Sequence, residues 1–409
     1  MSDLRKSALY HNSRSLFFGL LLFFIVLIFS LPCRAESSSE LNQKTAGLID
    51  NGAYILSRNN QVAAACNPDT LFSPASIWKI AVSAEALHIL GHDYRFTTDF
   101  YFDSRQNLYV KGHGDPLLIS EKINDIAILF KEKGVRKINS IFLDDTAFKL
   151  AGSAAGAGNS LNPYDAANCA LAVNFNTIFL EKKANGTIIS AEEQTPMLPL
   201  MAEKGKNLKP GRHRITIAHQ ADDSMRLSGQ LLRAMLETHG ICCVGKISRS
   251  PAPPELPLFY RHYSPPVSEI IGRMLLYSNN FMANQLFLVC GAEKYGSPAT
   301  WEKGKKTLNN FLLKEIGLNK ENFQVEEGSG LSRKNKITAR AMLKVLDYFQ
   351  NNRLLLDKKN GLLIKSGTLS NVFSYAGYQP ADNGLNSFVI ILNQEENNRD
   401  EILHLLLRF

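Results

Sequence analysis

Near both ends of the chain, the spacing of apolar residues is typical of a strand in some segments and of a helix in others. Residues 53–65 form two short runs around Asn59-Asn60, which predicts two strands joined by a tight turn. A helix is expected to begin at Ser73-Pro74, because serine caps helix N-termini well and proline suits the first helical position. Near the C-terminus, strand-like runs precede a helix-like segment; the runs are 361–365, 372–378 and 387–393.

The middle of the chain has a different texture. From Asp99 to Ala218, short strand-like runs alternate with turns, and Asn185-Gly186 is a strong hairpin signal. One clear helical period lies in this stretch, with apolar residues at Ile123, Ile126 and Phe130. This texture predicts a region that consists mostly of β-structure.

A second helical region begins at Pro265-Pro266, pauses at residues 278–280 and then resumes. Because helices and strands flank the β-rich stretch on both sides, we expect an α/β (α+β) domain that is split in sequence. Residues 36–95 and 263–409 would form this domain, and residues 96–262 would form an inserted, mostly β domain.

The N-terminus is typical of an exported protein. Basic residues precede an apolar run from Leu16 to Leu31, and polar residues follow Ala35. This pattern predicts a signal peptide over residues 1–35 and a periplasmic or otherwise extracytoplasmic location for the rest. An uncleaved anchor is the alternative, because the apolar run is long for a signal. Membrane association is expected only through this segment.

Composition narrows the kinds of partner and cofactor. The 409 residues include 46 basic and 38 acidic side chains, for a net charge of +8. No Lys/Arg stripe is interleaved with aromatic residues, so nucleic acid is not an expected partner. The 6 cysteines lack the paired spacing of a metal site. We therefore expect no metal and no organic cofactor.

Ser76 and Lys79 form the first motif with candidate chemistry. They lie three residues apart at the start of a predicted helix, so their side chains share one face. A neutral lysine amine can accept the proton of a serine hydroxyl, and burial or nearby positive charge lowers a lysine pKa toward that state. The helix N-terminus also favours negative charge on an attacked carbonyl.

Ser278 and Asn280 form the second motif, at the break between two predicted helices. The hydroxyl can relay a proton, and the amide can fix a lysine or a substrate carbonyl. Taken alone, either of these first two motifs is commonplace, as a helix start or a capping turn.

The third motif, here called the strand motif, is Lys365, Ser366, Gly367 and Thr368, which follow the strand-like run 361–364. The lysine and the hydroxyls can hold a carboxylate. The glycine lets a substrate backbone lie close to the strand. Three such motifs in this order resemble the signature of penicillin-binding proteins and serine β-lactamases.

Further segments make the resemblance more specific. The chain is similar to the class C low-molecular-mass penicillin-binding proteins, the D-alanyl-D-alanine carboxypeptidase/endopeptidase family of the DacB type. The segments that carry this similarity outside the motifs are 108–116, 144–148, 173–176, 264–266 and 328–333. The resemblance implies a β-lactamase/transpeptidase-like domain, with an antiparallel sheet and helices. It also explains the long separation of Ser76 and Ser278, because the family carries inserted domains there.

The resemblance also implies roles. Ser76 would attack the carbonyl before a terminal D-alanine, with Lys79 as base. Ser278 would relay the proton to the leaving amine, and Asn280 would orient Lys79 and the peptide amide. The strand motif would grip the terminal carboxylate, and the backbone N–H groups of Ser76 and Thr368 would form the oxyanion hole. Expected partners are peptidoglycan stem peptides ending in D-Ala-D-Ala, and β-lactams.

Three departures from the family pattern keep alternatives open. Ser366 replaces the usual threonine, Asn284 stands where an acidic residue is common, and the stretch from Asp347 to Lys365 is short. The short stretch favours a non-catalytic or weakly active peptidoglycan-binding relative. A β-lactamase is the other alternative, although the chain has no separate glutamate motif to position a deacylating water.

Overall fold

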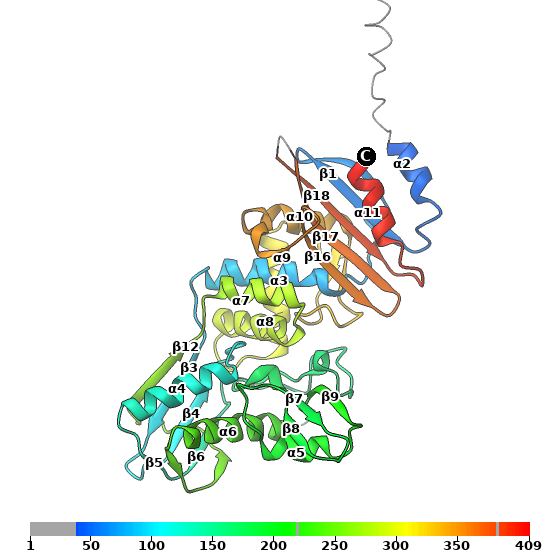
Figure 1. The fold of residues 1–409 in the computed structure, drawn as a ribbon. Helices are drawn as coiled ribbons and strands as arrows, with labels where there is room; N and C mark the ends of the chain where they lie inside the picture. Colours follow the sequence, from blue (N-terminus) through cyan, green and yellow to red (C-terminus); the bar gives the residue numbers. More distant parts are fainter. Residues whose placement is uncertain (1–37, 218–220, 382–383) are drawn as a thin grey trace, which may run out of the picture.

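The computed structural model describes residues 38–217, 221–381 and 384–409. Figure 1 shows the described residues coloured along the sequence, from blue at α2 (Ser38–Thr45) to red at the C-terminus. The predicted signal segment over residues 1–35 lies outside the described ranges. Within those ranges, no helix combines the length and the apolar character needed to cross a membrane.

A six-stranded antiparallel sheet brings the two ends of the chain together (Figure 1). The strand order is β15 (Asp357–Lys359), β16 (Leu362–Leu369), β17 (Val372–Ala381), β18 (Gly384–Leu392), β1 (Gly52–Arg58), β2 (Gln61–Cys66). β1 pairs with β18, with Gly52 opposite Leu392, so an N-terminal strand lies beside a C-terminal one. The strands predicted for both ends are confirmed, and β16 continues through the strand motif.

The side chains of β1 alternate between two cores, as the two-residue period of a strand requires. Ala53 and Ile55 pack into the main core, whereas Tyr54 and Leu56 pack into a smaller core on the other face. The main core is built with α3 (Trp78–Leu90), α7 (Val267–Tyr277), α8 (Asn280–Tyr295), α9 (Trp301–Lys314) and α10 (Ala339–Phe349). The smaller core is covered by α2 (Ser38–Thr45) and α11 (Arg399–Arg408).

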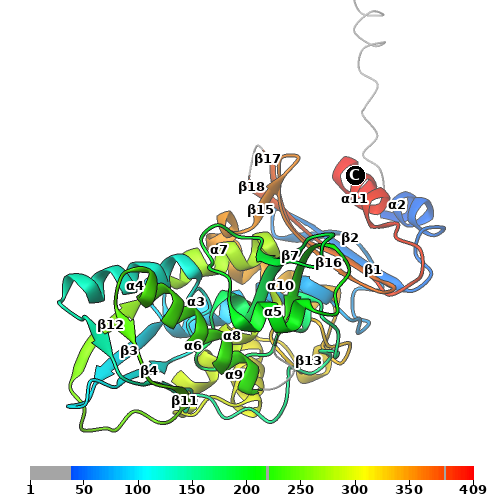
Figure 2. The same ribbon diagram turned by 60° about the horizontal axis from the view of Figure 1, so that its bottom comes forward.

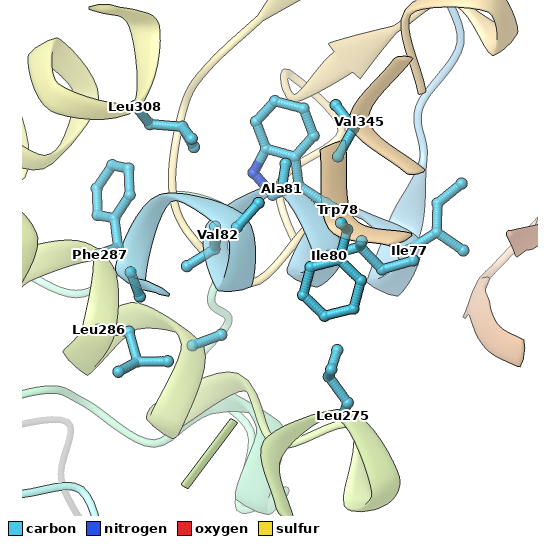
Figure 3. Close-up of a cluster of buried hydrophobic side chains, with 14 of the residues drawn as sticks. Ile77, Trp78, Ile80, Ala81, Val82, Leu275, Leu286, Phe287, Leu308 and Val345 are labelled. Carbon is cyan, nitrogen blue, oxygen red and sulfur yellow. The ribbon is translucent and has the colours of Figure 1, made fainter. Parts of the chain in front are cut away.

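The helix α3 lies in the middle of the main core. Figure 3 shows its side chains among Phe287 of α8, Leu308 of α9 and Val345 of α10. Trp78 is fully buried, and its indole N–H donates a hydrogen bond of 2.9 Å to the carbonyl of Glu327. Burial of a large apolar side chain stabilises a fold by roughly 1.5–3 kcal/mol. The helix that carries Lys79 is therefore held in place from several sides.

Residues 97–263 form a region with a core of its own (Figure 2). Its larger sheet has the order β11 (Ile247–Arg249), β6 (Ile141–Asp144), β4 (Leu108–Gly112), β3 (Thr97–Phe102), β12 (Leu258–Tyr263). A smaller sheet has the order β8 (Ile188–Ser190), β7 (Thr177–Lys182), β9 (Gly211–Thr216). These sheets pack with α4 (Ser120–Glu132), α5 (Pro199–Gly205) and α6 (Ala221–Thr238). The sequence predicts helices at α4 and, over residues 222–240, at α6, whereas it does not predict α5.

The inserted region is also joined to the main core. Ala154, Ala166 and Ala172 belong to that core, and Phe148 forms an isolated parallel bridge with Ala299. The backbone N–H of Lys149 donates to the carbonyl of Ala299 at 2.9 Å. These contacts anchor the insert against the helical side of the molecule.

Candidate active site

The candidate nucleophile lies in a turn just before α3. Ser76 is the middle residue of a 3-10 turn, η1 (Ala75–Ile77), and Ala75 has a left-handed φ of 50°. The predicted helix cap at Ser73 is wrong, because its hydroxyl is buried without a hydrogen-bond partner. Instead, the Asn393 side chain accepts from the Ser73 N–H at 2.9 Å and donates to its carbonyl at 3.1 Å. The turn is thus tied to the end of β18, and strain of this kind is common at functional sites.

The Lys79 side chain points from α3 toward the nucleophile and is fully buried. Its Nζ lies 3.1 Å from the Ser76 hydroxyl, 2.8 Å from the Asn280 amide oxygen and 2.6 Å from the Ser329 carbonyl. Burial, followed by the positive charge of Lys365, lowers the pKa of Lys79 to about 7, and the Glu327 carboxylate partly opposes this shift. A substantial fraction of the amine is therefore neutral near pH 7 and can accept the serine proton.

The second motif lies where α7 gives way to α8. Ser278 ends α7 with a left-handed φ of 53°, and the Asn279 side chain caps α8 by accepting from the Met282 N–H at 2.9 Å. This break turns the Ser278 and Asn280 side chains toward the two lysines. Ser278 accepts a hydrogen bond of 3.0 Å from Lys365, and Asn280 donates one of 3.3 Å to the carbonyl of Tyr164.

The strand motif lies on β16. Lys365 is buried and donates to the Ser278 hydroxyl and, at 2.9 Å, to the Ser366 carbonyl. Burial lowers the pKa of Lys365 to about 8, against the charge of Asp357 and together with the charge of Arg399. A side chain at Gly367 would place its Cβ 2.7 Å from the Ser76 N–H nitrogen. Only glycine lets the strand lie this close to the nucleophile.

Glu327 is a buried residue that sequence reasoning missed. Its carboxylate accepts from the Ser329 N–H at 2.7 Å, the Ser329 hydroxyl at 2.6 Å and the Gly330 N–H at 2.8 Å. It also accepts from the Asn335 amide at 2.7 Å. These bonds fix the loop whose Ser329 carbonyl contacts Lys79. The one sequence feature that could have indicated Glu327 is its position directly before Gly328, where the segment that carries the family resemblance begins.

The departure at Asn284 supports the same loop. Asn284 is buried on α8, and its amide oxygen accepts from the Gly328 N–H at 2.8 Å. The amide therefore provides the acceptor that a carboxylate could also provide, without adding a second buried negative charge beside Glu327.

These groups open on a cavity of about 530 Å³, here called the catalytic cavity. Its lining includes Ser76, Ser278, Asn280 and Thr368, together with Gly156, Tyr164, Gly330, Leu331, Arg333, Leu369 and Ser370. Four predicted site residues lie outside this lining: Ser366 is exposed, whereas Lys79, Lys365 and Gly367 are buried behind it.

Arg399 is a second residue that sequence reasoning missed. It lies at the start of α11, and its Nη1 donates to the Thr368 hydroxyl at 2.9 Å and to the Gly367 carbonyl at 2.8 Å. Its guanidinium also lies 4.5 Å from the centre of the Tyr375 ring. Because the Thr368 hydroxyl accepts from Arg399, its own hydrogen is free to point into the cavity.

The comparison with known families agrees with this geometry. The sequence profile of the D-Ala-D-Ala carboxypeptidase 3 (S13) family matches residues 35–203 and 204–362. The chain belongs to this family. The expected family and the serine-type carboxypeptidase class are thereby confirmed.

Two curated relatives cover most of this S13 protein. D-alanyl-D-alanine carboxypeptidase DacB of Haemophilus influenzae is 24% identical over 81% of the chain and 77% of its own length. A D-alanyl-D-alanine carboxypeptidase of Actinomadura sp. strain R39 is 25% identical over 78% of the chain and 73% of its own length.

Solved structures share the fold. Penicillin-binding protein 4 (dacB) of Haemophilus influenzae superposes with a TM-score of 0.74 at 22% identity, covering 88% of this chain and 94% of its own. A predatory peptidoglycan endopeptidase of Bdellovibrio bacteriovorus superposes with a TM-score of 0.56 at 14% identity, covering 86% and 90%. The predicted fold class, an antiparallel sheet with helices of the transpeptidase-like type, is confirmed.

Proposed function

We propose that this S13 protein is a D-alanyl-D-alanine carboxypeptidase/endopeptidase that acts on peptidoglycan stem peptides through an acyl-enzyme on Ser76. One observation carries the proposal. The Lys79 amine is fully buried, lies 3.1 Å from the Ser76 hydroxyl and has a pKa of about 7. A serine beside such an amine can be deprotonated at neutral pH, which is what nucleophilic attack requires.

In the first step, neutral Lys79 takes the proton of Ser76 while Oγ bonds to the carbonyl carbon before the terminal D-alanine. The N–H groups of Ser76 and Thr368 would hold the oxyanion, and the loss of one such donor typically costs about 3–4 kcal/mol. Ser278 accepts a hydrogen bond from Lys365, so its own hydrogen can pass to the leaving amine, and Lys79 returns to Ser278 the proton that it took from Ser76. The C–N bond then breaks, and water later hydrolyses the ester at Ser76.

The two sides of the catalytic cavity would hold different parts of the substrate. The terminal carboxylate would lie on the strand side, near Lys365 and the Thr368 hydroxyl that Arg399 orients. The acyl part would lie on the side of Asn280, whose amide can bind the peptide backbone as well as Lys79.

The short stretch before the strand motif supports activity rather than its loss. The chain there forms a 3-10 segment, Gln350–Leu355, and the edge strand β15, which pairs with β16. β15 pairs with residues 362–364, directly before the strand motif, and the motif itself pairs with β17. Lys365 also keeps its contacts with Ser278 and with the Ser366 carbonyl. These contacts argue against a non-catalytic relative.

We further propose where the enzyme acts and how its chain is divided into domains. Residues 1–35 would be an export signal or an anchor, residues 36–95 and 263–409 the catalytic domain, and residues 96–262 an inserted domain. The rest of the chain would then face the cell wall. A penicillin G-acylated form of the Bdellovibrio endopeptidase supports β-lactams as ligands of this fold.

The test is turnover of a muramyl pentapeptide together with labelling by a fluorescent penicillin. We expect steady release of D-alanine and covalent labelling, both abolished by Ser76→Ala. Ser153→Ala, at an exposed serine of the insert, serves as the matched control and should behave like the parent.

The same assays separate the alternatives. Labelling without turnover of the pentapeptide would favour a peptidoglycan-binding relative, and rapid hydrolysis of the penicillin would favour a β-lactamase. Undiminished labelling of Ser76→Ala would show that another residue is the nucleophile.

A further inference from the structure

A second cavity, of about 450 Å³, adjoins the catalytic cavity. Its apolar lining comes from Phe175, Tyr277 and Met282, together with Leu117, Ile119 and Pro163. Polar side chains complete the lining; they are Glu121, Asn174, Thr177, Glu192, Gln194, Arg214, Arg273 and Asn279. The lining thus combines apolar and aromatic surface with groups that can form hydrogen bonds, and small-molecule sites use both.

The two cavities share a wall. Along the loop between α7 and α8, Ser278 and Asn280 line the catalytic cavity, whereas Tyr277 and Asn279 line the second one. The same holds in the insert, where Tyr164 lines the first cavity and its neighbour Pro163 lines the second. A substrate that leaves the catalytic cavity past Asn280 therefore meets the second cavity next.

A strained turn presents Phe175 to this cavity. Three successive non-glycine residues, Asn174, Phe175 and Asn176, have left-handed φ values of 49°, 60° and 53°. Side chains hold them there: Asn174 accepts from the Ser120 N–H at 2.9 Å, and Asn176 donates to the Ala167 carbonyl at 2.8 Å. Conformations that are this unfavourable persist only where the surroundings enforce them, and they cluster at binding sites.

The turn also touches the catalytic side of the molecule. The Phe175 ring packs edge-on against Phe281, with 6.3 Å between the ring centres, and Phe281 directly follows Asn280. The exposed partner in this wall is Tyr277, which leaves 75% of its surface accessible. Its ring contributes little to the core, so it is available to a ligand.

The charges around the second cavity are mostly paired. Arg214 and Glu192 approach within 2.6 Å, and Arg273 and Glu269 within 2.7 Å. Such a rim suits a neutral polar ligand better than an ionic one. A sugar has this chemistry, because its flat C–H face packs on aromatic rings and its hydroxyl and N-acetyl groups bond to amides such as Asn279 and Gln194.

The direction in which the stem peptide runs through the catalytic cavity indicates which part of peptidoglycan reaches the second cavity. On the acyl side of the scissile bond, a stem peptide leads back to its sugar, and the four intervening residues span at most about 14 Å. In the binding mode proposed above, the acyl part lies toward Asn280, which belongs to the shared wall. We propose that the second cavity binds an N-acetylated sugar of the glycan strand whose own stem peptide occupies the catalytic cavity. This inference rests on the proposed function.

The experiment compares two substrates, a free pentapeptide and the same pentapeptide attached to its N-acetylated disaccharide. For the parent protein, we expect kcat/KM to be about tenfold higher for the sugar-bearing substrate, since aromatic packing contacts of this kind contribute a factor of about two to ten each. In Tyr277→Ala the ratio of the two kcat/KM values should fall at least about threefold. Gln194→Ala, at a lining residue that comes from the insert, should lower the ratio as well.

Tyr263→Ala is the matched control, because Tyr263 is also exposed but lines neither cavity. Its ratio should equal that of the parent. Equal kcat/KM values for the two substrates in the parent would overturn the sugar site and leave the proposed function intact. Equal losses on both substrates in Tyr277→Ala and in Gln194→Ala would also overturn it. No turnover of either substrate by the parent would instead refute the proposed function.

Discussion

The helical side of the active site and its strand side each hold one buried lysine, and the two lysines have different neighbours. Lys79, on α3, contacts the Ser76 hydroxyl, the Asn280 amide and the Ser329 carbonyl, and its pKa is about 7. Lys365, on β16, contacts the Ser278 hydroxyl and a backbone carbonyl, and its pKa is about 8.

This difference indicates a division of labour. The partners of Lys79 are groups that react with or align every substrate. Changes on the helical side should therefore slow acylation whether or not the substrate has a free carboxylate. The strand side gathers Lys365, the Thr368 hydroxyl and Arg399 around one edge of the cavity, which suits an anion. It should therefore matter most for substrates with a free terminal carboxylate.

The largest effect is expected from Lys79→Ala. Loss of the base should slow acylation by about 10²–10⁴-fold for carboxylate substrates, neutral thioesters and β-lactams alike. Stopped-flow measurement of acylation rates would show this. Lys246→Ala, at an exposed lysine of the insert, is the control and should acylate like the parent. A loss confined to one substrate class would contradict a general role of the helical side.

Lys365→Ala should discriminate between substrates. A lost charge-assisted hydrogen bond corresponds to about a ten- to hundredfold drop in kcat/KM for peptides with a free carboxylate. Neutral thioesters should lose much less. Lys358→Ala, at an exposed lysine on the neighbouring strand β15, is the matched control. Equal losses on both substrate classes would remove the distinction between the two sides.

The pH dependence of kcat/KM tests both lysines together. Lys79 must be neutral, so the rate should fall about tenfold per pH unit below its pKa of about 7. Lys365 must be charged, so capture of carboxylate substrates should weaken as the pH rises above about 8. The profile for a peptide should thus be bell-shaped, whereas a neutral thioester should show only the acid limb. An alkaline limb for the thioester would contradict this assignment.

Glu327→Gln should move the acid limb. The Glu327 carboxylate raises the pKa of Lys79, so removing its charge should shift the limb to lower pH. The side-chain amide that this substitution introduces also carries N–H donors, which would face the N–H and O–H donors of the loop. The kcat at the optimum should therefore drop several-fold, and the melting temperature should fall. Glu326→Gln is the control, because Glu326 pairs instead with Lys305 at 3.0 Å. An unchanged limb would show that Glu327 does not act on Lys79.

The contrast between the three motifs and Glu327 shows what could be predicted from the sequence. Each of the first two motifs has a fixed local spacing, Ser76 with Lys79 and Ser278 with Asn280. Their chemistry could therefore be inferred from the sequence, before the structure showed that the motifs lie together. Strand and hairpin positions followed from apolar alternation, as in β1 and β18. Contacts between residues distant in sequence leave no such spacing.

Three outcomes at particular residues illustrate that limit. Ser73 does not cap a helix, because Asn393, from the far end of the chain, binds its backbone. Glu327 and Arg399 reach the site only through tertiary packing, one by way of a loop and the other from α11. Arg399 has no local pattern that separates it from a surface arginine, and the only signal for Glu327 is its place next to Gly328.

The smallest effect is expected from Arg399→Gln, which asks how far the strand side extends. The guanidinium donates to the Thr368 hydroxyl and the Gly367 carbonyl and lies over the Tyr375 ring, so it orients the hydroxyl rather than contacting the scissile bond. Glutamine can keep one donor but loses the charge. We expect KM for carboxylate peptides to rise about threefold with little change in kcat, since one hydrogen bond contributes about 1 kcal/mol. Neutral thioesters should be unaffected, and Arg408→Gln, at the exposed end of the same helix, controls for changes in α11 itself. A fall in kcat for both substrate classes would instead place Arg399 with the groups that serve every substrate.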